Sequence, residues 1–253
     1  MNVGMEGESR SSKLILNATA RVPDSNALGF SGDSSAVSQV KVTVPPPDFR
    51  RPSVVYLLAK RMLDIFVSAL VLLALAPFLL VVAILIKSTS AGPVIYRSRR
   101  VGKCGKEFWF YKLRTMYTGA EALNAQLAHQ NQHTGPIFKI KCDPRITPVG
   151  KILRKYSIDE LPQLLHVLMG DMTLVGPRPH LPTEVVHYDD KAAQRLLITP
   201  GLTCYWQIMG RSDLAYEEWI DLDLRYMREM CFWLDIKILL KTPAALLRAD
   251  GAY

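Results

Sequence analysis

The chain has 253 residues, which is room for one globular domain with an added tail or membrane segment. Hydrophobic residues make up 49% of it, a fraction that suits a globular protein, and the formal net charge is +8. Its four cysteines are too far apart to form a close metal-ligand pair, so we assign neither a zinc site nor disulfides and expect reduced thiols facing the cytoplasm.

The positive charge is concentrated beside an apolar stretch. Residues 87–155 carry fourteen basic and three acidic residues, and they follow directly on the uncharged run Ile65–Ile86. A basic region in this position suits anionic lipid head groups and phosphorylated ligands. A solvated positive face is the alternative interpretation of the same residues.

Residues 1–50 are interpreted as a disordered leader. They are rich in Ser, Gly and Asn, lack helical periodicity and end in Val44-Pro45-Pro46-Pro47. No apolar core of a signal peptide follows the start, which argues against secretion.

Residues 51–87 are predicted to be the membrane segment. As a helix, the 22 uncharged residues of Ile65–Ile86 would extend about 33 Å, against a hydrocarbon core of about 30 Å. Pro77 interrupts the run and predicts a bend, and basic residues flank both ends, which favours the cytoplasmic side for each end. We therefore predict a broken, re-entrant helix hairpin that dips into one leaflet and returns. An ordinary proline-containing transmembrane helix is the alternative.

Residues 88–253 are predicted to form a cytoplasmic catalytic domain, which gives a helix-rich α+β fold with an N-terminal membrane helix. Alternating residues on either side of Gly102-Lys103-Cys104-Gly105 indicate a β-hairpin. The strands are expected at 93–99 and 107–114, and helices at 120–132, 148–155, 161–168, 189–197 and 215–230. The segment 232–241, with aromatic residues at one end, is either an interfacial helix or an internal packing helix.

The adjacent carboxylates of Asp159 and Glu160 are the most informative feature of the sequence. Ser157 and Glu160 have the spacing of a capping box and Asp159 could itself be a cap, so a purely structural role is a strong alternative. At a helix N-terminus, however, free N–H groups favour an ionised carboxylate and can hold a phosphate beside it. Asp159 could then attack phosphorus to form an aspartyl-phosphate, and Glu160 could hold a Mg²⁺ ion on the diphosphate.

Two arginines can complete such a site. Arg178 is fixed between two prolines in the turn Gly176-Pro177-Arg178-Pro179, and Arg154 precedes the acidic pair. Forked guanidinium groups match the oxygens of a phosphate.

An ordered series of motifs along most of the chain resembles that of a known protein family. The motifs that carry it are Lys60-Arg61-x-x-Asp64, the apolar run with Pro77, Tyr111-Lys112-Leu113-Arg114-Thr115-Met116, Asp143-Pro144-Arg145-Ile146-Thr147, Ser157-Ile158-Asp159-Glu160-Leu161-Pro162-Gln163, Val175-Gly176-Pro177-Arg178-Pro179, Pro200-Gly201-Leu202-Thr203, Trp206-Gln207 and Gly210-Arg211-Ser212. In this order, over about residues 55–247, the chain resembles the bacterial sugar transferases, the monotopic phosphoglycosyl transferases.

The resemblance implies a UDP-sugar as donor, undecaprenyl phosphate as acceptor and Mg²⁺ as cofactor. By motif matching, Asp159 is the nucleophile that takes the phosphosugar and expels UMP, Glu160 serves the metal, and the carrier phosphate then attacks the aspartyl intermediate. The residues assigned to substrate phosphate are Lys112, Arg114, Arg145, Arg154 and Arg178.

The resemblance also implies a place in the bacterial inner membrane, with the catalytic domain facing the cytoplasm. The residues assigned to the point where a re-entrant helix enters the membrane are Lys60, Arg61, Asp64 and Pro77, with simple snorkelling as the alternative for Lys60. Membrane lipid is therefore an expected partner, nucleic acid is not, and a homodimer stays open.

Three positions depart from the family pattern. His166 stands where Asn is usual, Ser98 where Gln is common and Cys204 where Gly would follow Thr203. These leave the reaction class intact but the sugar undetermined. The chain resembles the minimal catalytic form of the family, without further transmembrane helices in front.

Other interpretations compete with this one. A non-catalytic module that binds anionic lipid explains the charge but not the Asp-Glu pair, and a nucleic-acid binder lacks a recognisable module. A direct, single-step transfer would keep the chemistry with Asp159 positioning the acceptor. We interpret Asp221-Leu222-Asp223 as a solvated helix face, and leave His129 and His133 unassigned.

Overall fold

The computed structural model describes residues 14–20, 38–44, 52–127, 129, 131, 140, 142–210 and 214–248. The α-helices are α1 (Val54–Thr89), α2 (Asn124–Leu127), α3 (Pro148–Lys155), α4 (Leu164–Met169), α5 (Pro182–Val185), α6 (Asp190–Ala193), α7 (Tyr205–Met209), α8 (Tyr216–Glu229) and α9 (Phe232–Arg248). The strands are β1 (Leu14–Ala20), β2 (Ser38–Val44), β3 (Ile95–Val101), β4 (Glu107–Leu113), β5 (Thr173–Val175) and β6 (Gly201–Thr203). Short 3₁₀ segments are η1 (Lys103–Gly105), η2 (Ala120–Leu123), η4 (Ile158–Gln163) and η5 (Gln194–Leu197). The helix-rich α+β class is confirmed.

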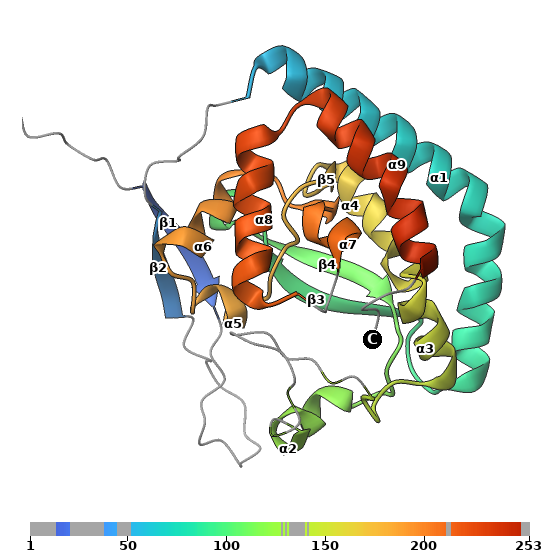
Figure 1. Ribbon diagram of the computed structural model, residues 1–253. Coiled ribbons are helices and arrows are strands. Elements are labelled where there is room, and N and C mark those ends of the chain that lie inside the picture. The colour runs from blue at the N-terminus through green and yellow to red at the C-terminus, as the bar shows by residue number, and fades with distance from the viewer. Residues whose placement is uncertain are drawn as a thin grey trace, which may run out of the picture.

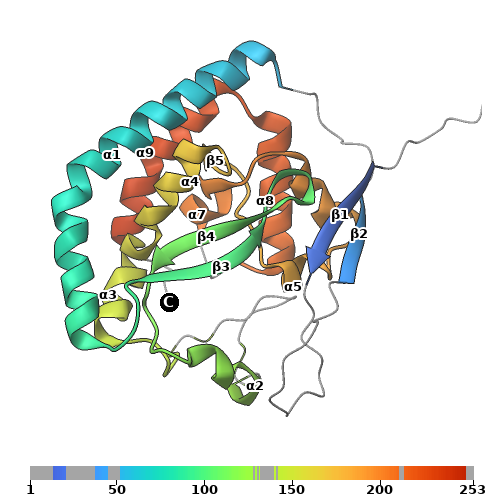
Figure 2. The same ribbon diagram turned by 180° about the vertical axis from the view of Figure 1, so that it is seen from behind.

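Helix α1 is one continuous helix of 36 residues that follows the edge of the domain (Figures 1 and 2). The Ser53 side chain accepts a bond from the Tyr56 N–H and so caps its start, and Pro77 lies inside it. Both views show α1 changing direction partway along, as expected where proline removes a helical hydrogen bond. It is long and apolar enough to cross a membrane, and many of its large apolar side chains are exposed: Phe66, Leu70, Leu73, Phe78, Leu80, Val81 and Ile84.

The first half of α1 is bound to the domain by polar side chains. Lys60 Nζ lies 2.8 Å from Asp235 Oδ2 on α9 and donates to the Val175 carbonyl at 2.9 Å. Arg61 donates to the carbonyls of Val167 and Leu168 near the end of α4, at 2.5 and 2.7 Å. Buried charges need such partners, so these side chains fix the register of α1 on the domain.

Asp64, one turn further along α1, is also buried. Its carboxylate accepts from the Thr173 hydroxyl at 2.7 Å and from the Leu174 N–H at 2.9 Å. Asp64 thus joins α1 directly to strand β5.

The second half of α1 contacts the same domain. Val82 and Ile86 are buried with Leu113 of β4 and Leu153 of α3. Arg114, at the end of β4, donates to the carbonyls of Ser90 and Ala91, the residues that follow α1.

The β3/β4 hairpin is confirmed as an antiparallel pair with Ile95 opposite Leu113 and Val101 opposite Glu107. Phe108 and Phe110 of β4 enter the main core with Leu164 and Val167 of α4. His166, the departure from the family pattern, is buried between these elements and accepts a bond from the Tyr111 N–H at 3.0 Å. Its ring therefore joins α4 to β4.

Strands β5 and β6 form a parallel pair, with Thr173 opposite Gly201. A Cβ atom on Gly201 would lie 2.1 Å from the Gly176 nitrogen, so only glycine permits this approach. The close packing directs the chain from β5 into the Gly176–Pro179 turn.

The predicted helices agree with the structure to different degrees. The helix at 148–155 is confirmed as α3, with Thr147 as its cap, and 215–230 is confirmed as α8 with one residue fewer at each end. The prediction at 189–197 is met by α6 followed by η5, and that at 161–168 by the end of η4 followed by α4. For 120–132 the structure describes only η2, α2 and residues 129 and 131, and the rest lies outside the described residues.

For two further segments, residues 1–50 and 232–241, the structure adds contacts that the sequence did not predict. Within residues 1–50 the structure describes the paired strands β1 and β2, which lie beside α5 and α6, and the other residues lie outside the described part. The segment 232–241 lies in α9, which buries Asp235 and Ile238 against the domain while Trp233 and Leu240 are exposed. Both roles considered for it are therefore compatible with its two faces.

Candidate active site

Asp159 and Glu160 lie in η4, between α3 and α4. Ser157 adopts a left-handed conformation (φ 54°), which turns the chain sharply after α3, and its side chain makes no capping bond. The capping-box interpretation is therefore wrong. The expected α-helix N-terminus is replaced by a 3₁₀ turn with Asp159 in its first turn.

Three cations from different elements surround Asp159. Lys112 extends from β4, Arg154 from α3 and Arg178 from the turn after β5, and each interacts electrostatically with the Asp159 carboxylate. Only 6% of Asp159 is exposed, and burial is the main cause that raises its pKa. The neighbouring Glu160 raises this pKa further, while the three cations lower it without cancelling the rise. The site thus holds a poorly solvated carboxylate within reach of concentrated positive charge.

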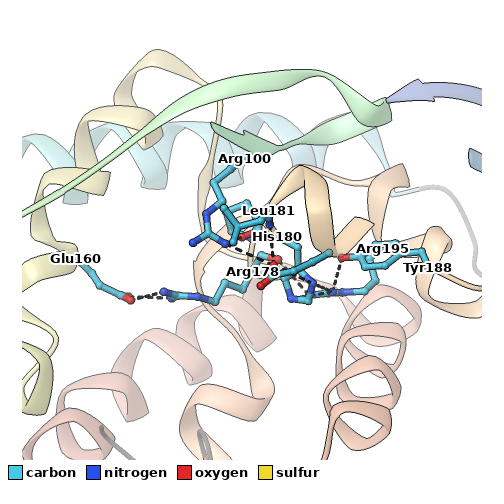
Figure 3. A network of polar contacts seen from close by, with 9 residues as sticks. Arg100, Glu160, Arg178, His180, Leu181, Tyr188 and Arg195 are labelled. Atoms are coloured by element: carbon cyan, nitrogen blue, oxygen red, sulfur yellow. Dashed lines mark hydrogen bonds and ion pairs between the residues drawn. The ribbon is translucent and has the colours of Figure 1, made fainter. Parts of the chain in front are cut away.

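Glu160 forms a two-pronged ion pair with Arg178. Arg178 Nη1 donates to Glu160 Oε2 at 3.0 Å and Nη2 to Oε1 at 2.5 Å. Figure 3 shows the Arg178 side chain reaching from its turn toward Glu160. Burial alone would lower the Arg178 pKa, but the Glu160 carboxylate outweighs it, so Arg178 stays fully charged.

Lys112 is the cation whose charge is most easily lost. Burial lowers its pKa to about 8, and repulsion by Arg154 adds to that effect, while Asp159 acts in the opposite direction. A negative ligand beside Lys112 would stabilise its protonated form. Lys112 is therefore a cation whose protonated form would be strengthened by a bound anion.

Arg154 is the third cation that interacts with Asp159. Burial lowers its pKa, whereas the charges of Asp159 and Asp143 raise it. The sequence-predicted Asp159, Glu160, Lys112, Arg154 and Arg178 are thus brought together.

Two other predicted substrate-binding residues make contacts elsewhere. Arg114 is buried and holds the chain after α1, as described above. Arg145 grips Asp143 with Nε at 2.8 Å and Nη2 at 2.5 Å, and this pair lies close enough to Arg154 to influence its charge. The structure thus places Arg114 at the end of α1 and Arg145 beside Arg154.

The residues assigned to the membrane entry also contact protein. Lys60, Arg61 and Asp64 bind α9, α4 and β5, and Pro77 lies along the apolar part of α1. Lys60 and Arg61 thus direct their charged groups into the domain and not toward lipid. These tertiary contacts could not be predicted from the sequence.

Sequence reasoning missed three charged residues near the Arg178 turn. Arg100 of β3 donates to the Pro179 carbonyl at 3.3 Å and interacts with Arg178 and Glu160. Arg195 and Asp223 form a buried ion pair at 2.7 Å.

The solvated-face interpretation is wrong for Asp223, which is fully buried, and correct for Asp221, whose side chain is 62% exposed. The helical spacing of Asp223 with Trp219, Ile220 and Met227, all on the buried face, is the signal that could have identified it.

Comparison with known proteins gives a consistent picture. The family described as "Bacterial sugar transferase" matches residues 55–249. An undecaprenyl-phosphate galactose phosphotransferase of Salmonella typhimurium is 43% identical over 199 residues, 77% of this chain and 41% of that protein. The galactosyl transferase CpsE of Streptococcus agalactiae is 42% identical over 198 residues, 78% of this chain and 44% of that protein.

A third relative is covered more fully. The UDP-glucose:undecaprenyl-phosphate glucose-1-phosphate transferase of Caulobacter vibrioides is 39% identical over 210 residues, 80% of this chain and 74% of that protein. The chain thus spans less than half the length of the first two relatives and about three quarters of this one.

The buried Asp159 carboxylate should reduce the stability of the folded protein. Because its pKa is raised on folding, the ionised form is disfavoured in the folded state, and that cost is present above the raised pKa and lost as the pH falls through it. Asp159→Asn should therefore unfold at a higher temperature than the wild type at pH 7 to 8, with a difference that shrinks in acid. The exposed Asp221→Asn serves as control and should shift the unfolding temperature little at any pH. An Asp159→Asn protein that is less stable than wild type at pH 8 contradicts this electrostatic account.

Proposed function

Because the chain belongs to the bacterial sugar transferase family, we propose that it transfers a phosphosugar from a UDP-sugar to undecaprenyl phosphate and releases UMP, the first step in building a polysaccharide or glycoconjugate. The names of the relatives indicate the donor and the carrier lipid. The observation that carries the proposal for this chain is the buried Asp159 carboxylate facing Lys112, Arg154 and Arg178. A diphosphate is the substrate class whose charge such a set of cations matches.

In the proposed first step, Asp159 attacks the phosphorus that bears the sugar. A bond forms between its carboxylate oxygen and that phosphorus, while the bridging P–O bond breaks and UMP leaves with the electron pair. Poor solvation makes the carboxylate reactive, and the surrounding cations offset the charge that accumulates on the phosphoryl oxygens and on UMP.

In the second step, a phosphate oxygen of the carrier lipid attacks the same phosphorus. The acyl-phosphate bond to Asp159 breaks, the carboxylate is regenerated and the sugar remains attached through a new diphosphate. The alternative of direct transfer, with Asp159 only positioning the acceptor, would form no covalent intermediate.

Arg178 is assigned to neutralising the charge of the substrate diphosphate, and Glu160 to orienting Arg178. Arg178, held by both Glu160 oxygens, is oriented before substrate arrives, so little rotational freedom remains to be lost on binding. Arg100 adds a further guanidinium beside this pair.

We also propose a magnesium ion, which Glu160 would hold beside Asp159. Mg²⁺ prefers carboxylate oxygens and commonly completes its shell with substrate phosphates and water. Among the described residues no group of three or more acidic, His or Cys side chains is placed to hold a metal, so the substrate would have to supply the other ligands. When bound, the ion would neutralise the diphosphate and its leaving group. Arg178 and the metal would compete for the same Glu160 oxygens.

We further propose that α1 is re-entrant and that the domain lies on the cytoplasmic face of the membrane. Two observations support this: the first half of α1 is bound through Lys60 and Asp64, and its second half packs through Val82 and Ile86, on the same domain. A helix whose two ends contact one folded body cannot place them on opposite sides of a bilayer. The exposed apolar side chains between them would enter one leaflet.

Transfer can be tested directly by UMP release from purified, detergent-solubilised protein given Mg²⁺, undecaprenyl phosphate and each of a panel of UDP-sugars. Wild type should release UMP with at least one donor, and Asp159→Asn should lower the rate by about 10³-fold or more, because the amide is a poor nucleophile. Asp221→Asn should stay active. Release by Asp159→Asn at the wild-type rate would refute the assigned nucleophile, and vesicle binding without turnover on any donor would favour a lipid-binding module.

The re-entrant arrangement predicts that both ends of α1 face the cytoplasm. Val55→Cys and Ser88→Cys, both at exposed positions, can be introduced separately after the exposed Cys104, Cys142 and Cys231 are replaced by serine. In intact spheroplasts an impermeant maleimide should label neither, and after lysis it should label both. Labelling of one position but not the other in intact spheroplasts would establish a spanning helix instead.

A further inference from the structure

The backbone of the turn that carries Arg178 is held at nearly every carbonyl. The Val175 carbonyl accepts from Lys60 Nζ at 2.9 Å and from the Tyr226 hydroxyl at 3.1 Å, and the Pro177 carbonyl accepts from the Gly201 N–H at 2.8 Å. The Pro179 carbonyl accepts from Arg100. Donors from α1, α8, β6 and β3 thus converge on five residues of chain.

The carbonyl of Arg178 itself is held by Arg195. Arg195 Nη2 donates to it at 3.1 Å, while Nη1 donates to the Tyr188 hydroxyl at 2.9 Å and lies 3.1 Å from the nearer ring nitrogen of His180. Only 4% of Arg195 is exposed. Figure 3 shows Arg195 on the far side of the turn from Glu160, so its guanidinium is directed at the backbone and not at the proposed substrate.

Asp223 supplies the counter-charge. It lies on α8, has no exposed surface, and its carboxylate lies 2.7 Å from Arg195 Nη2. A buried ion pair is poor evidence for stability, since well-packed apolar residues of similar volume often serve as well. An apolar pair could not supply the N–H groups by which Arg195 donates to the Arg178 carbonyl and to the Tyr188 hydroxyl.

We propose that Arg195 and Asp223 are positioning residues that fix the Arg178 turn, and through it aim the Arg178 guanidinium at Glu160 beside Asp159. The expected effect of these residues on turnover rests on the proposed function. Their expected effect on the conformation of the turn rests on the geometry alone. Asp223 orients Arg195, Arg195 holds the Arg178 carbonyl, and the flanking prolines pass that constraint to the side chain because they restrict the backbone on either side.

The first test is a double-mutant cycle with Asp223→Asn and Arg178→Ala, scored by UMP release. Asp223→Asn keeps the volume of the side chain and removes its charge, and it should lower kcat by about 10–100-fold, the cost of a displaced catalytic group. In the Arg178→Ala background the same change should cost less than about twofold, because its target is gone. An equal loss in both backgrounds would overturn the proposal and indicate a general structural role.

The second test needs no turnover. Hydrogen–deuterium exchange at the amides of Gly176, Arg178, His180 and Leu181 should rise in Asp223→Asn and stay at the wild-type level in Asp221→Asn, which alters an exposed ion pair two residues away on α8. Unchanged exchange in the turn would overturn the proposal whatever the activity.

The two readouts separate this inference from the proposed function. If the wild type releases no UMP with any donor, the proposed function is refuted, and hydrogen exchange alone tests the positioning role. If the wild type is active but exchange in the Arg178 turn is unchanged in Asp223→Asn, only the positioning role is refuted. Should Asp223→Asn not fold, Tyr188→Phe removes one Arg195 contact with a smaller perturbation and should raise exchange in the same turn.

Discussion

The arrangement of the site depends on one electrostatic constraint: the Asp159 carboxylate is buried, and a buried charge needs opposite charges close to it. Burial and the neighbouring Glu160 raise the Asp159 pKa more than Lys112, Arg154 and Arg178 lower it, so the carboxylate stays poorly stabilised although three cations lie around it. Each cation comes from a different element, which means that β4, α3 and the turn after β5 must be held in place together. Much of the buried polar structure serves this requirement.

Helix α1 takes part in that framework as well as carrying the apolar surface. Lys60 binds Asp235 of α9 and the Val175 carbonyl at the start of the Arg178 turn, and Asp64 binds the backbone of β5. The same helix therefore carries exposed apolar side chains and polar side chains that contact the domain around the site. This arrangement would place the proposed chemistry close to the membrane surface, where a phosphate on a lipid carrier is accessible.

Local signals in the sequence were sufficient for several elements and for the centre of the site. The helix at 148–155 and the β3/β4 hairpin were predicted from local patterns, and the adjacent Asp159 and Glu160 identified the segment beside which Lys112, Arg154 and Arg178 converge. What the sequence could not supply were contacts between residues distant in the chain. The Arg114 contact with the end of α1 and the Arg195–Asp223 pair depend on tertiary packing, and a basic residue in a motif looks the same whether it faces substrate or protein. The 3₁₀ turn at Asp159 also escaped prediction, because its capping-box spacing is that of an ordinary helix start.

The central claim, that Asp159 is the nucleophile, is tested most directly by intact-protein and peptide mass spectrometry of enzyme incubated with its UDP-sugar donor and Mg²⁺ in the absence of undecaprenyl phosphate. The account predicts an adduct with the mass of one phosphosugar, located on the peptide that contains Asp159 and discharged when carrier lipid is added. A wild-type enzyme that turns over with lipid but forms no adduct, or that carries the adduct on another residue, would contradict it.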